Sequence, residues 1–267
     1  MNLVKLKYCL IKLSLVVVVS INASGQRRSV DNLTHFDDRP LHFGFYLGLN
    51  TMDYRITNYN NVYENPVFND PALKENAKAI YGDKNSFAAE VYTILPGFTV
   101  GGVVNYRLTR DFDLRFTPGM SLGSRSFKYY IDVDPDLVKG SSGMDEQTYL
   151  TTPSAYVDLP IGVRYKGFRH HNARPYIYLG VAYRQDLENK RITESVVHLK
   201  KNGGYAEVGL GIDSYLEYFR FTAEFRFSYG LNSLIRHDTA PDKPIPYYGF
   251  IFKELNSNIF TLIFYFE

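Results

Sequence analysis

Apolar and polar residues alternate with a period of two in eight separate segments of the chain. In the segment 219–231, for example, Phe219 and Phe221 are apolar, and Arg220, Thr222 and Glu224 occupy the positions between apolar residues. Such alternation predicts β-strands with one apolar face and one polar face. The eight predicted strands cover residues 41–49, 98–108, 112–122, 155–165, 175–183, 206–212, 219–231 and 260–266.

The two faces of these strands differ in composition. The apolar face carries no charged residue, whereas the other face carries nine charged residues and nine glycines. The interior of an eight-stranded barrel is just wide enough to be filled by side chains, so a face of Phe, Leu, Val and Ile would overfill it. We therefore expect the glycine-rich face to point inward and the apolar face to point into lipid, where a Lys or Arg near the midplane would cost about 2–4 kcal/mol.

Long and short connections alternate along the chain, which is typical of an up-and-down meander of antiparallel strands. The long connections are residues 50–97, 123–154, 184–205 and 232–259, and the short ones are 109–111, 166–174 and 213–218. An even number of strands places both termini on the same side of the membrane.

These observations predict an all-β fold, namely an eight-stranded antiparallel up-and-down transmembrane β-barrel with a filled polar lumen and four long extracellular loops. The expected location is the bacterial outer membrane, with both termini periplasmic. The alternative is a lipocalin-like soluble barrel, which would turn the same apolar face inward.

The polar face supplies the candidate lumen residues. Because a charge away from water needs a partner, we expect a salt-bridged network that fills the barrel; the functional alternative is a proton or ion pathway. The predicted network consists of Arg107, Asp113, Arg115, Asp158, Arg164, Glu207, Arg220, Glu224 and Arg226. The predicted lipid-facing aromatics are Phe43, Phe45, Phe98, Phe112, Phe116, Phe219, Phe221, Phe225, Phe227, Phe260, Phe264 and Phe266.

The N-terminus has the pattern of a secretory signal peptide, which we assign to residues 1–25. Lysines precede the short apolar run 13–19, and Ala23 and Gly25 place cleavage before Gln26. The alternative is an N-terminal membrane anchor, for which the run is too short. Cleavage would remove Cys9, the only cysteine of the chain. Residues 26–40 then form a periplasmic tail, and residues 41–267 form the barrel.

Composition excludes several classes of function. The formal net charge of +2 argues against a nucleic-acid binder held by phosphate contacts. A single Cys excludes a cysteine-rich zinc site. We expect no cofactor, no metal and no small-molecule substrate, and we expect outer-membrane lipid as a partner.

The predicted loops contain weaker signals. Asp70 as N-cap, Pro71 at the first helical position and Gly82 after the end predict a short helix in the first long connection. The spacing of Asp132, Asp134 and Asp136 allows a cation site, but no Gly-centred calcium-loop pattern accompanies it, so solvated carboxylates are the favoured interpretation. His170 and His171 are adjacent, and neighbouring side chains on an extended chain point apart, so no shared metal is expected.

No phosphate loop or zinc-protease motif occurs in the chain. We therefore do not expect an enzyme. A barrel enzyme acting on lipid A or on peptides is the less favoured alternative.

Five segments resemble the strands of Bacteroidetes-type outer-membrane barrels, and the overall pattern is most similar to the PorT family of the type IX secretion system. The segments are residues 156–166, 174–183, 205–213, 219–232 and 260–266, and the terminal aromatic strand differs from the family's ending by the extra Glu267. The resemblance implies an accessory role in protein secretion, through contacts with other type IX components made by the loops, the periplasmic turns or residues 26–40. It brings no catalytic residue. The competing function is a generic structural or adhesive barrel.

Overall fold

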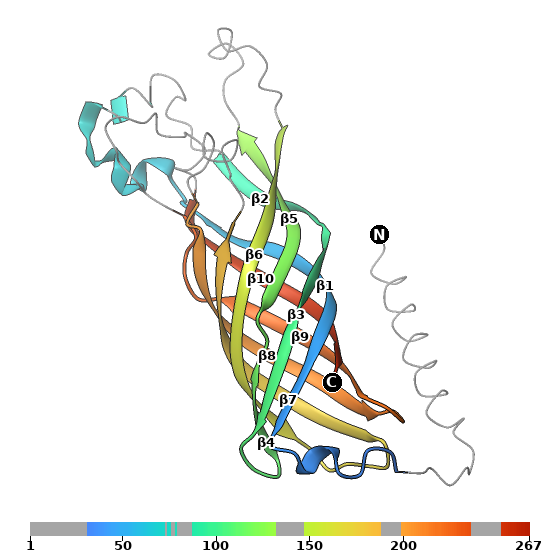
Figure 1. The fold of residues 1–267 in the computed structure, drawn as a ribbon. Coiled ribbons are helices and arrows are strands. Elements are labelled where there is room, and N and C mark those ends of the chain that lie inside the picture. The colour runs from blue at the N-terminus through green and yellow to red at the C-terminus, as the bar shows by residue number, and fades with distance from the viewer. Residues whose placement is uncertain are drawn as a thin grey trace, which may run out of the picture.

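Ten antiparallel β-strands form one sheet in the computed structural model, which describes residues 31–72, 74–75, 78, 87–131, 147–187, 199–235 and 252–267 (Figure 1). The strands are β1 (Leu41–Asn58), β2 (Phe87–Ile94), β3 (Pro96–Arg107), β4 (Phe112–Phe116), β5 (Gly119–Ile131), β6 (Gln147–Lys166), β7 (Ala173–Asp186), β8 (Asn202–Tyr215), β9 (Arg220–Gly230) and β10 (Phe252–Phe266).

The sheet closes into a ring because β1 pairs with both β10 and β3. Two of the eight positions in the ring each contain two strands that follow one another along the chain. Only Leu95 separates β2 from β3, and only Thr117 and Pro118 separate β4 from β5. The order around the ring is therefore β1, β2/β3, β4/β5, β6, β7, β8, β9 and β10. The predicted all-β, eight-stranded, antiparallel up-and-down arrangement is confirmed.

The prediction of one unbroken strand over residues 112–122 is wrong at Pro118. Proline has no N–H to donate to a strand ladder, so the regular pairing stops there. The break is bridged by two main-chain hydrogen bonds. Gly102 N donates to Pro118 O at 3.0 Å, and Thr117 N donates to Pro160 O at 3.1 Å. The two halves therefore stay aligned as one side of the barrel.

The strands extend farther into the long connections than the alternation predicts. β1 continues to Asn58, β2 begins at Phe87, and β6 contains 20 residues. A strand needs only about 9–11 residues to cross a bilayer. Outside the hydrocarbon region the outer face need not be apolar. The alternation of apolar and polar residues therefore ends before the strand pairing does, which continues for example between Tyr54 and Ser257.

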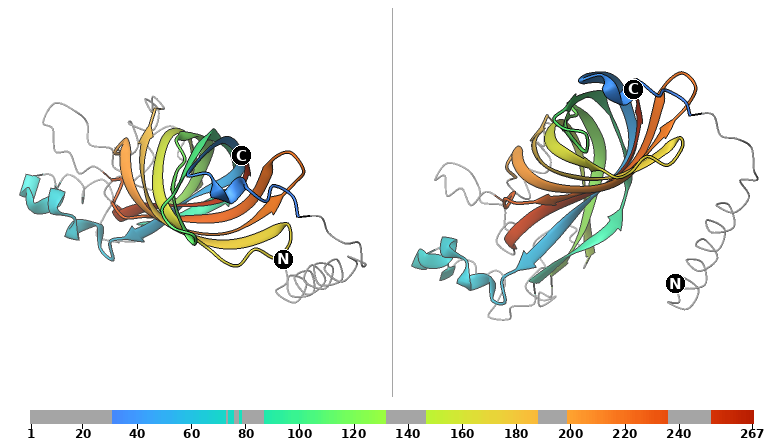
Figure 2. Two further views of the ribbon diagram at one scale, coloured as in Figure 1. Left: turned by 60° about the horizontal axis from the view of Figure 1, so that its bottom comes forward. Right: turned by 90° about the horizontal axis from the view of Figure 1, so that it is seen from below.

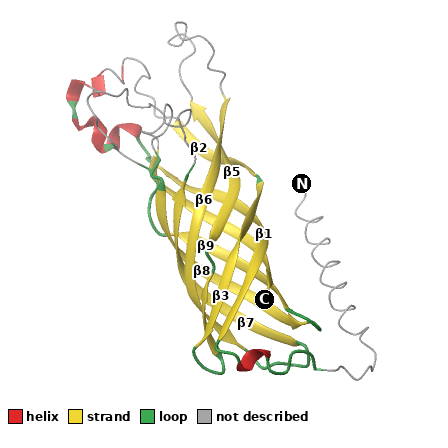
Figure 3. Ribbon diagram, in the orientation of Figure 1, coloured by secondary structure: helices red, strands yellow, loops and turns green. Residues whose placement is uncertain are grey.

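The two ends of the barrel differ. Residues 108–111, 167–172 and 216–219 connect strands at one end, which we call the turn end. The opposite ends of the strands, where the long connections begin and end, form the other end of the barrel, which we call the loop end (Figure 3). The 3₁₀ helix η1 (Phe36–Asp38) lies across the turn end (Figure 2).

The first long connection contains η2 (Val62–Glu64), η3 (Pro66–Asn69) and part of the predicted helix. Residues 71–72, 74–75 and 78 are helical, and Ala72 N donates to Asp70 Oδ1 at 3.0 Å, as an N-cap requires. Gly82 lies outside the described residues. Among the residues that the structure describes, no helix is long and apolar enough to cross a membrane.

Apolar side chains point outward and polar side chains point inward. Phe43 is 65% exposed and Leu210 is 61% exposed, whereas Tyr178 and Arg115 are 0% exposed. The core of the molecule is therefore the lumen.

Inward-facing glycines make room for inward-facing tyrosines. A Cβ at Gly119 would lie 2.1 Å from Tyr46 Oη, and one at Gly211 would lie 2.3 Å from Tyr176 Cζ. These tyrosine rings therefore require glycine close by in the sheet. Gly211 is the direct pairing partner of Tyr176, and Gly119 lies one strand beyond the neighbour of the Tyr46 strand. The high glycine content of the inner face follows from the limited space.

We expect Leu179→Arg, in the middle of β7, to lower the free energy of unfolding by about 2–4 kcal/mol in phosphatidylcholine vesicles, because the side chain faces hydrocarbon. Leu216→Arg, in a connection at the turn end, should cost only about 0–1 kcal/mol. Urea unfolding of both variants measures the difference. Equal losses would show that the exposed apolar face is not in contact with lipid.

Candidate functional site

Glu224 is the centre of the polar network inside the barrel. Its Oε2 accepts hydrogen bonds from Arg115 Nη1 at 3.0 Å and from Tyr176 Oη at 2.5 Å, and its Oε1 accepts one from Arg226 Nε at 2.7 Å. Both Arg115 and Glu224 have fully buried side chains. The Arg115 guanidinium also lies 4.2 Å from the ring centroid of Tyr265, where a cation–π contact adds stabilisation.

The Arg115–Glu224 pair spans the barrel from one side to the other. Arg115 belongs to β4 and Glu224 belongs to β9, and these strands occupy the third and seventh positions in the ring of eight. They are therefore opposite each other. A direct ion pair across the full diameter shows that side chains close the lumen at this level.

A second cluster lies around Glu207. Its Oε1 accepts from Arg184 Nη2 at 2.6 Å and from Ser228 Oγ at 2.8 Å, and its Oε2 accepts from Arg226 Nη1 at 3.2 Å. Arg184 Nε also donates to Asp158 Oδ1 at 3.1 Å. Arg226 contacts both Glu224 and Glu207, so the two clusters form one continuous network.

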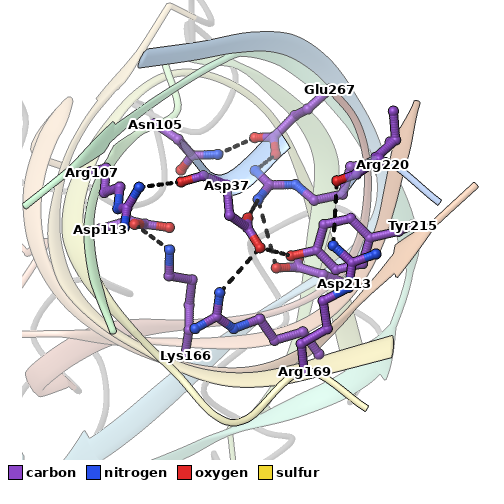
Figure 4. A network of polar contacts seen from close by, with 12 residues as sticks. Asp37, Asn105, Arg107, Asp113, Lys166, Arg169, Asp213, Tyr215, Arg220 and Glu267 are labelled. Carbon is purple, nitrogen blue, oxygen red and sulfur yellow. Dashed lines mark hydrogen bonds and ion pairs between the residues drawn. The ribbon is translucent and has the colours of Figure 1, made fainter. Parts of the chain in front are cut away.

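Further ion pairs line the lumen toward the turn end (Figure 4). Arg164 Nη2 donates to Asp213 Oδ2 at 2.6 Å, and Lys166 Nζ donates to Asp113 Oδ1 at 2.6 Å. Each pair joins strands that are separated along the chain but close in the ring. The burial of both pairs means that each charge depends on its partner.

The last residue of the chain takes part in the network. The Glu267 side chain is paired with Arg220 and accepts a hydrogen bond from Asn105, and its Oε1 lies 3.6 Å from Arg115 Nη2. Main-chain bonds between Arg220 and Glu267 hold this residue in the sheet. The extra residue after the terminal aromatic strand therefore contributes a carboxylate to the lumen.

The N-terminal segment, residues 31–40, covers the turn end of the lumen. Asp37 projects into it: its Oδ2 accepts from Tyr215 Oη at 2.8 Å and from Arg174 Nη1 at 3.2 Å, and its main-chain O accepts from Arg107 Nη1 at 2.5 Å (Figure 4). Its Oδ1 lies 3.9 Å from Arg220 Nη1.

Arg125 occupies a different environment toward the loop end. It is 1% exposed, and its guanidinium donates to the hydroxyls of Ser154 at 3.0 Å, Tyr156 at 2.6 Å and Ser257 at 2.7 Å. The ring of Tyr54 lies 5.0 Å from it. Among the buried cations of the described residues, Arg125 alone forms no ion pair with a described carboxylate. Hydroxyl groups and aromatic rings carry its stabilisation.

The structure places eight of the nine sequence-predicted lumen charges in the interior as buried residues. Arg107, the ninth, is half-buried at the turn end. The eight are Asp113, Arg115, Asp158, Arg164, Glu207, Arg220, Glu224 and Arg226.

The structure places the twelve predicted lipid-facing aromatics on the outside of the barrel, and none of them is buried. Four are half-buried rather than exposed because they pack against neighbouring rings: Phe221, Phe227, Phe264 and Phe266. Phe227 and Phe260, for example, lie 4.7 Å apart between ring centroids. Most of these contacts join β9 and β10, so one side of the barrel is rich in Phe.

Sequence reasoning missed several lumen charges, and most of them continue the inward register of a predicted strand by one or two steps of two residues. They are Arg125, Lys166, Arg174, Arg184, Asp186, Asp213 and Glu267. Extending each alternating segment until its polar face ended would have found them. Asp37 lies outside every strand, and no periodic signal points to it.

The structure describes only one of the two groups of residues considered as candidate metal sites. Asp132, Asp134 and Asp136 lie outside the described residues. The rings of His170 and His171 lie edge to face, 4.5 Å apart, so the premise that these side chains point apart is wrong. The cause is the left-handed backbone of His171, whose φ is 52°, in a turn rather than an extended chain. Within the described ranges, no three His, Cys, Asp or Glu side chains could hold a metal ion.

The model of the family described as outer membrane protein beta-barrel domain matches residues 22–236, which is most of the chain. The chain belongs to this family. Its location in the outer membrane follows from the family and agrees with the outward apolar face.

Among solved structures, the outer membrane protein OprG from Pseudomonas aeruginosa is similar at 13% identity, with a TM-score of 0.36. The match covers 84% of this chain and 92% of OprG. No curated protein matches the chain significantly.

We expect Glu224→Gln to lower the free energy of unfolding by about 3–5 kcal/mol, because it leaves Arg115 and Arg226 with one buried counter-charge fewer. Glu217→Gln, at an exposed position in a turn, is the matched control and should change stability by less than about 0.5 kcal/mol. Urea unfolding in vesicles measures both. A loss as small as that of the control would show that the pair is not structural.

We expect Arg125→Met to change the free energy of unfolding by no more than about 1 kcal/mol, because it removes a buried charge and leaves only hydroxyls behind. Arg184→Met should cost about 3–5 kcal/mol, because it leaves Glu207 and Asp158 without this partner. The same unfolding assay compares them. If Arg125→Met costs as much as Arg184→Met, a carboxylate partner of Arg125 must exist.

Proposed function

We propose that this outer-membrane barrel acts through contacts with other proteins and not as a conducting pore. The observation that carries the proposal is the ion pair between Arg115 and Glu224, which crosses the lumen between opposite strands. An eight-stranded barrel has room inside for side chains but not for a passing polypeptide. The surfaces left for function are then the two ends of the barrel. The proposal assigns no catalytic step to the chain.

We place the protein, more specifically, as an accessory or assembly component of the type IX secretion system. Support comes from the resemblance of five strand segments to Bacteroidetes-type outer-membrane barrels and of the overall pattern to the PorT family, and the filled lumen agrees with an accessory role. Its partners would be outer-membrane lipid along the apolar face and other type IX components at the loops or turns. A generic structural or adhesive barrel remains the alternative.

The proposed orientation puts the turn end and both termini in the periplasm and the long loops outside the cell. Outer-membrane barrels with an even number of strands have short periplasmic turns and longer extracellular loops. Here the short connections, the N-terminal segment and Glu267 share one end, which supports this orientation.

We expect deletion of the gene to abolish release of cargo bearing a C-terminal sorting domain, as measured by mass spectrometry of the culture medium. Complementation with the wild-type chain should restore release. The Glu217→Gln variant should restore it equally, because this exposed change leaves the barrel intact.

A deletion strain that secretes normally would contradict the type IX role. If that strain instead shows altered surface adhesion or envelope stability, the generic barrel is the better assignment. A lost lipid or peptide conversion would indicate an enzyme.

A further inference from the structure

The N-terminal segment contacts the barrel chiefly through one aromatic ring and one carboxylate. The Phe36 ring stacks on His42 at 4.2 Å between centroids, and the Arg220 guanidinium lies 4.7 Å from its centre. Asp37 contacts the side chains of Arg174 and Tyr215. Phe36 and Asp37 are consecutive, so together they occupy one site.

That site is built mainly of cations, and we call it the mouth. It comprises Arg107, Arg174, Tyr215 and Arg220, each of which contacts Asp37. Arg174 and Arg220 are 7% and 1% exposed. Arg107 contacts the main-chain oxygen of Asp37 and forms no ion pair with a described carboxylate. Arg220 is also paired with Glu267 and Asp213, whereas the further acidic contact of Arg174 is Asp111 at 3.6 Å, which is about half exposed. Without the Asp37 carboxylate, Arg174 would therefore keep only this half-exposed partner, and Arg107 would have no described carboxylate partner.

Arg169 supplies a second attachment beside the mouth. It donates to the main-chain oxygens of Asn32 and Leu33 and stacks on Tyr215 at 3.7 Å. Asn32 N also donates to Asn172 Oδ1 at 2.8 Å. These contacts recognise the backbone of the segment, whereas the Asn32 side chain also donates to Tyr215 O at 3.2 Å. They therefore suit a peptide that follows the same backbone path, in which Leu33 is left-handed with a φ of 50°.

The N-terminal segment lies at the surface and is not needed to close the lumen. None of residues 31–40 is buried. The lumen is already crossed by the Arg115–Glu224 pair, which makes no contact with the segment. A piece of chain with few buried contacts opens at a low free-energy cost. Covering the mouth therefore serves a purpose other than sealing a pore.

We propose that the mouth is a peptide-binding site for an aromatic residue followed by a carboxylate, which the chain's own Phe36 and Asp37 occupy. A segment of a partner protein with the same pair of side chains replaces them at the turn end. This rests on the proposed function, because it assigns one of the protein contacts to a defined site. Charge-assisted hydrogen bonds to the carboxylate supply the specificity.

The test is binding of a fluorescein-labelled peptide with the sequence of residues 31–40 to the full mature protein in detergent micelles, measured by anisotropy. Phe36→Ala/Asp37→Asn weakens the internal occupant and should bind the peptide about tenfold more tightly than the wild type. A peptide with Asn in place of Asp37 should bind that variant about tenfold more weakly.

Asp38→Asn is the matched control in the chain. This substitution makes the same change of charge one residue away. Asp38 is largely exposed and pairs only with His35 among described residues. This variant should bind the peptide as weakly as the wild type. Equal binding by the wild type and Phe36→Ala/Asp37→Asn, or undiminished binding of the Asn peptide, would overturn the proposal.

A second variant tests the site without changing Phe36, Asp37 or the side chains of the mouth. Asn32→Cys/Asn172→Cys should form a disulfide that locks the segment in place, and the predicted mature chain has no other cysteine. Oxidation should abolish the weak peptide binding, and reduction should restore it. Equal binding in both states would contradict the proposal. These outcomes do not depend on secretion, so failure here and failure of the secretion role are distinguishable.

Discussion

The pairing of ionised side chains inside a narrow barrel is the constraint on which the rest of this structure depends. Eight strands enclose a space that a single layer of side chains can fill. In that space the Glu224 carboxylate accepts hydrogen bonds from Arg115, Arg226 and Tyr176. Removing one member of an ion pair leaves its partners with one buried counter-charge fewer. The inner face therefore tolerates few alternatives, and the glycines beside Tyr46 and Tyr176 follow from the same lack of space.

This constraint also determines where the molecule can function. The outer face is apolar and contacts lipid, and the middle of the lumen is filled by the Arg115–Glu224 pair and its neighbours. Only the two ends remain for recognition of other molecules. At the turn end, Asp37 and Glu267 both bring carboxylates from near the ends of the described chain to Arg220. Asp37 and Glu267 thus meet at one basic surface.

The fold was predictable because lipid and lumen impose opposite demands on successive residues, which produces a pattern that sequence records directly. Arg184 and Asp213 were missed only because the alternation was cut short before them. The break at Pro118 was not predicted, since proline on the outer face satisfies the apolar pattern while lacking the N–H. The position of Asp37 could not be predicted, because it depends on the three-dimensional meeting of Arg107, Arg174 and Tyr215.

The central claim is that this is a closed barrel that works through its ends. Single-channel recording of the refolded wild-type protein in planar lipid bilayers tests it most directly. We expect no stable conductance steps at either polarity, because the Arg115–Glu224 pair bridges the lumen between opposite strands. A reproducible, ohmic conductance from the wild-type protein would contradict it.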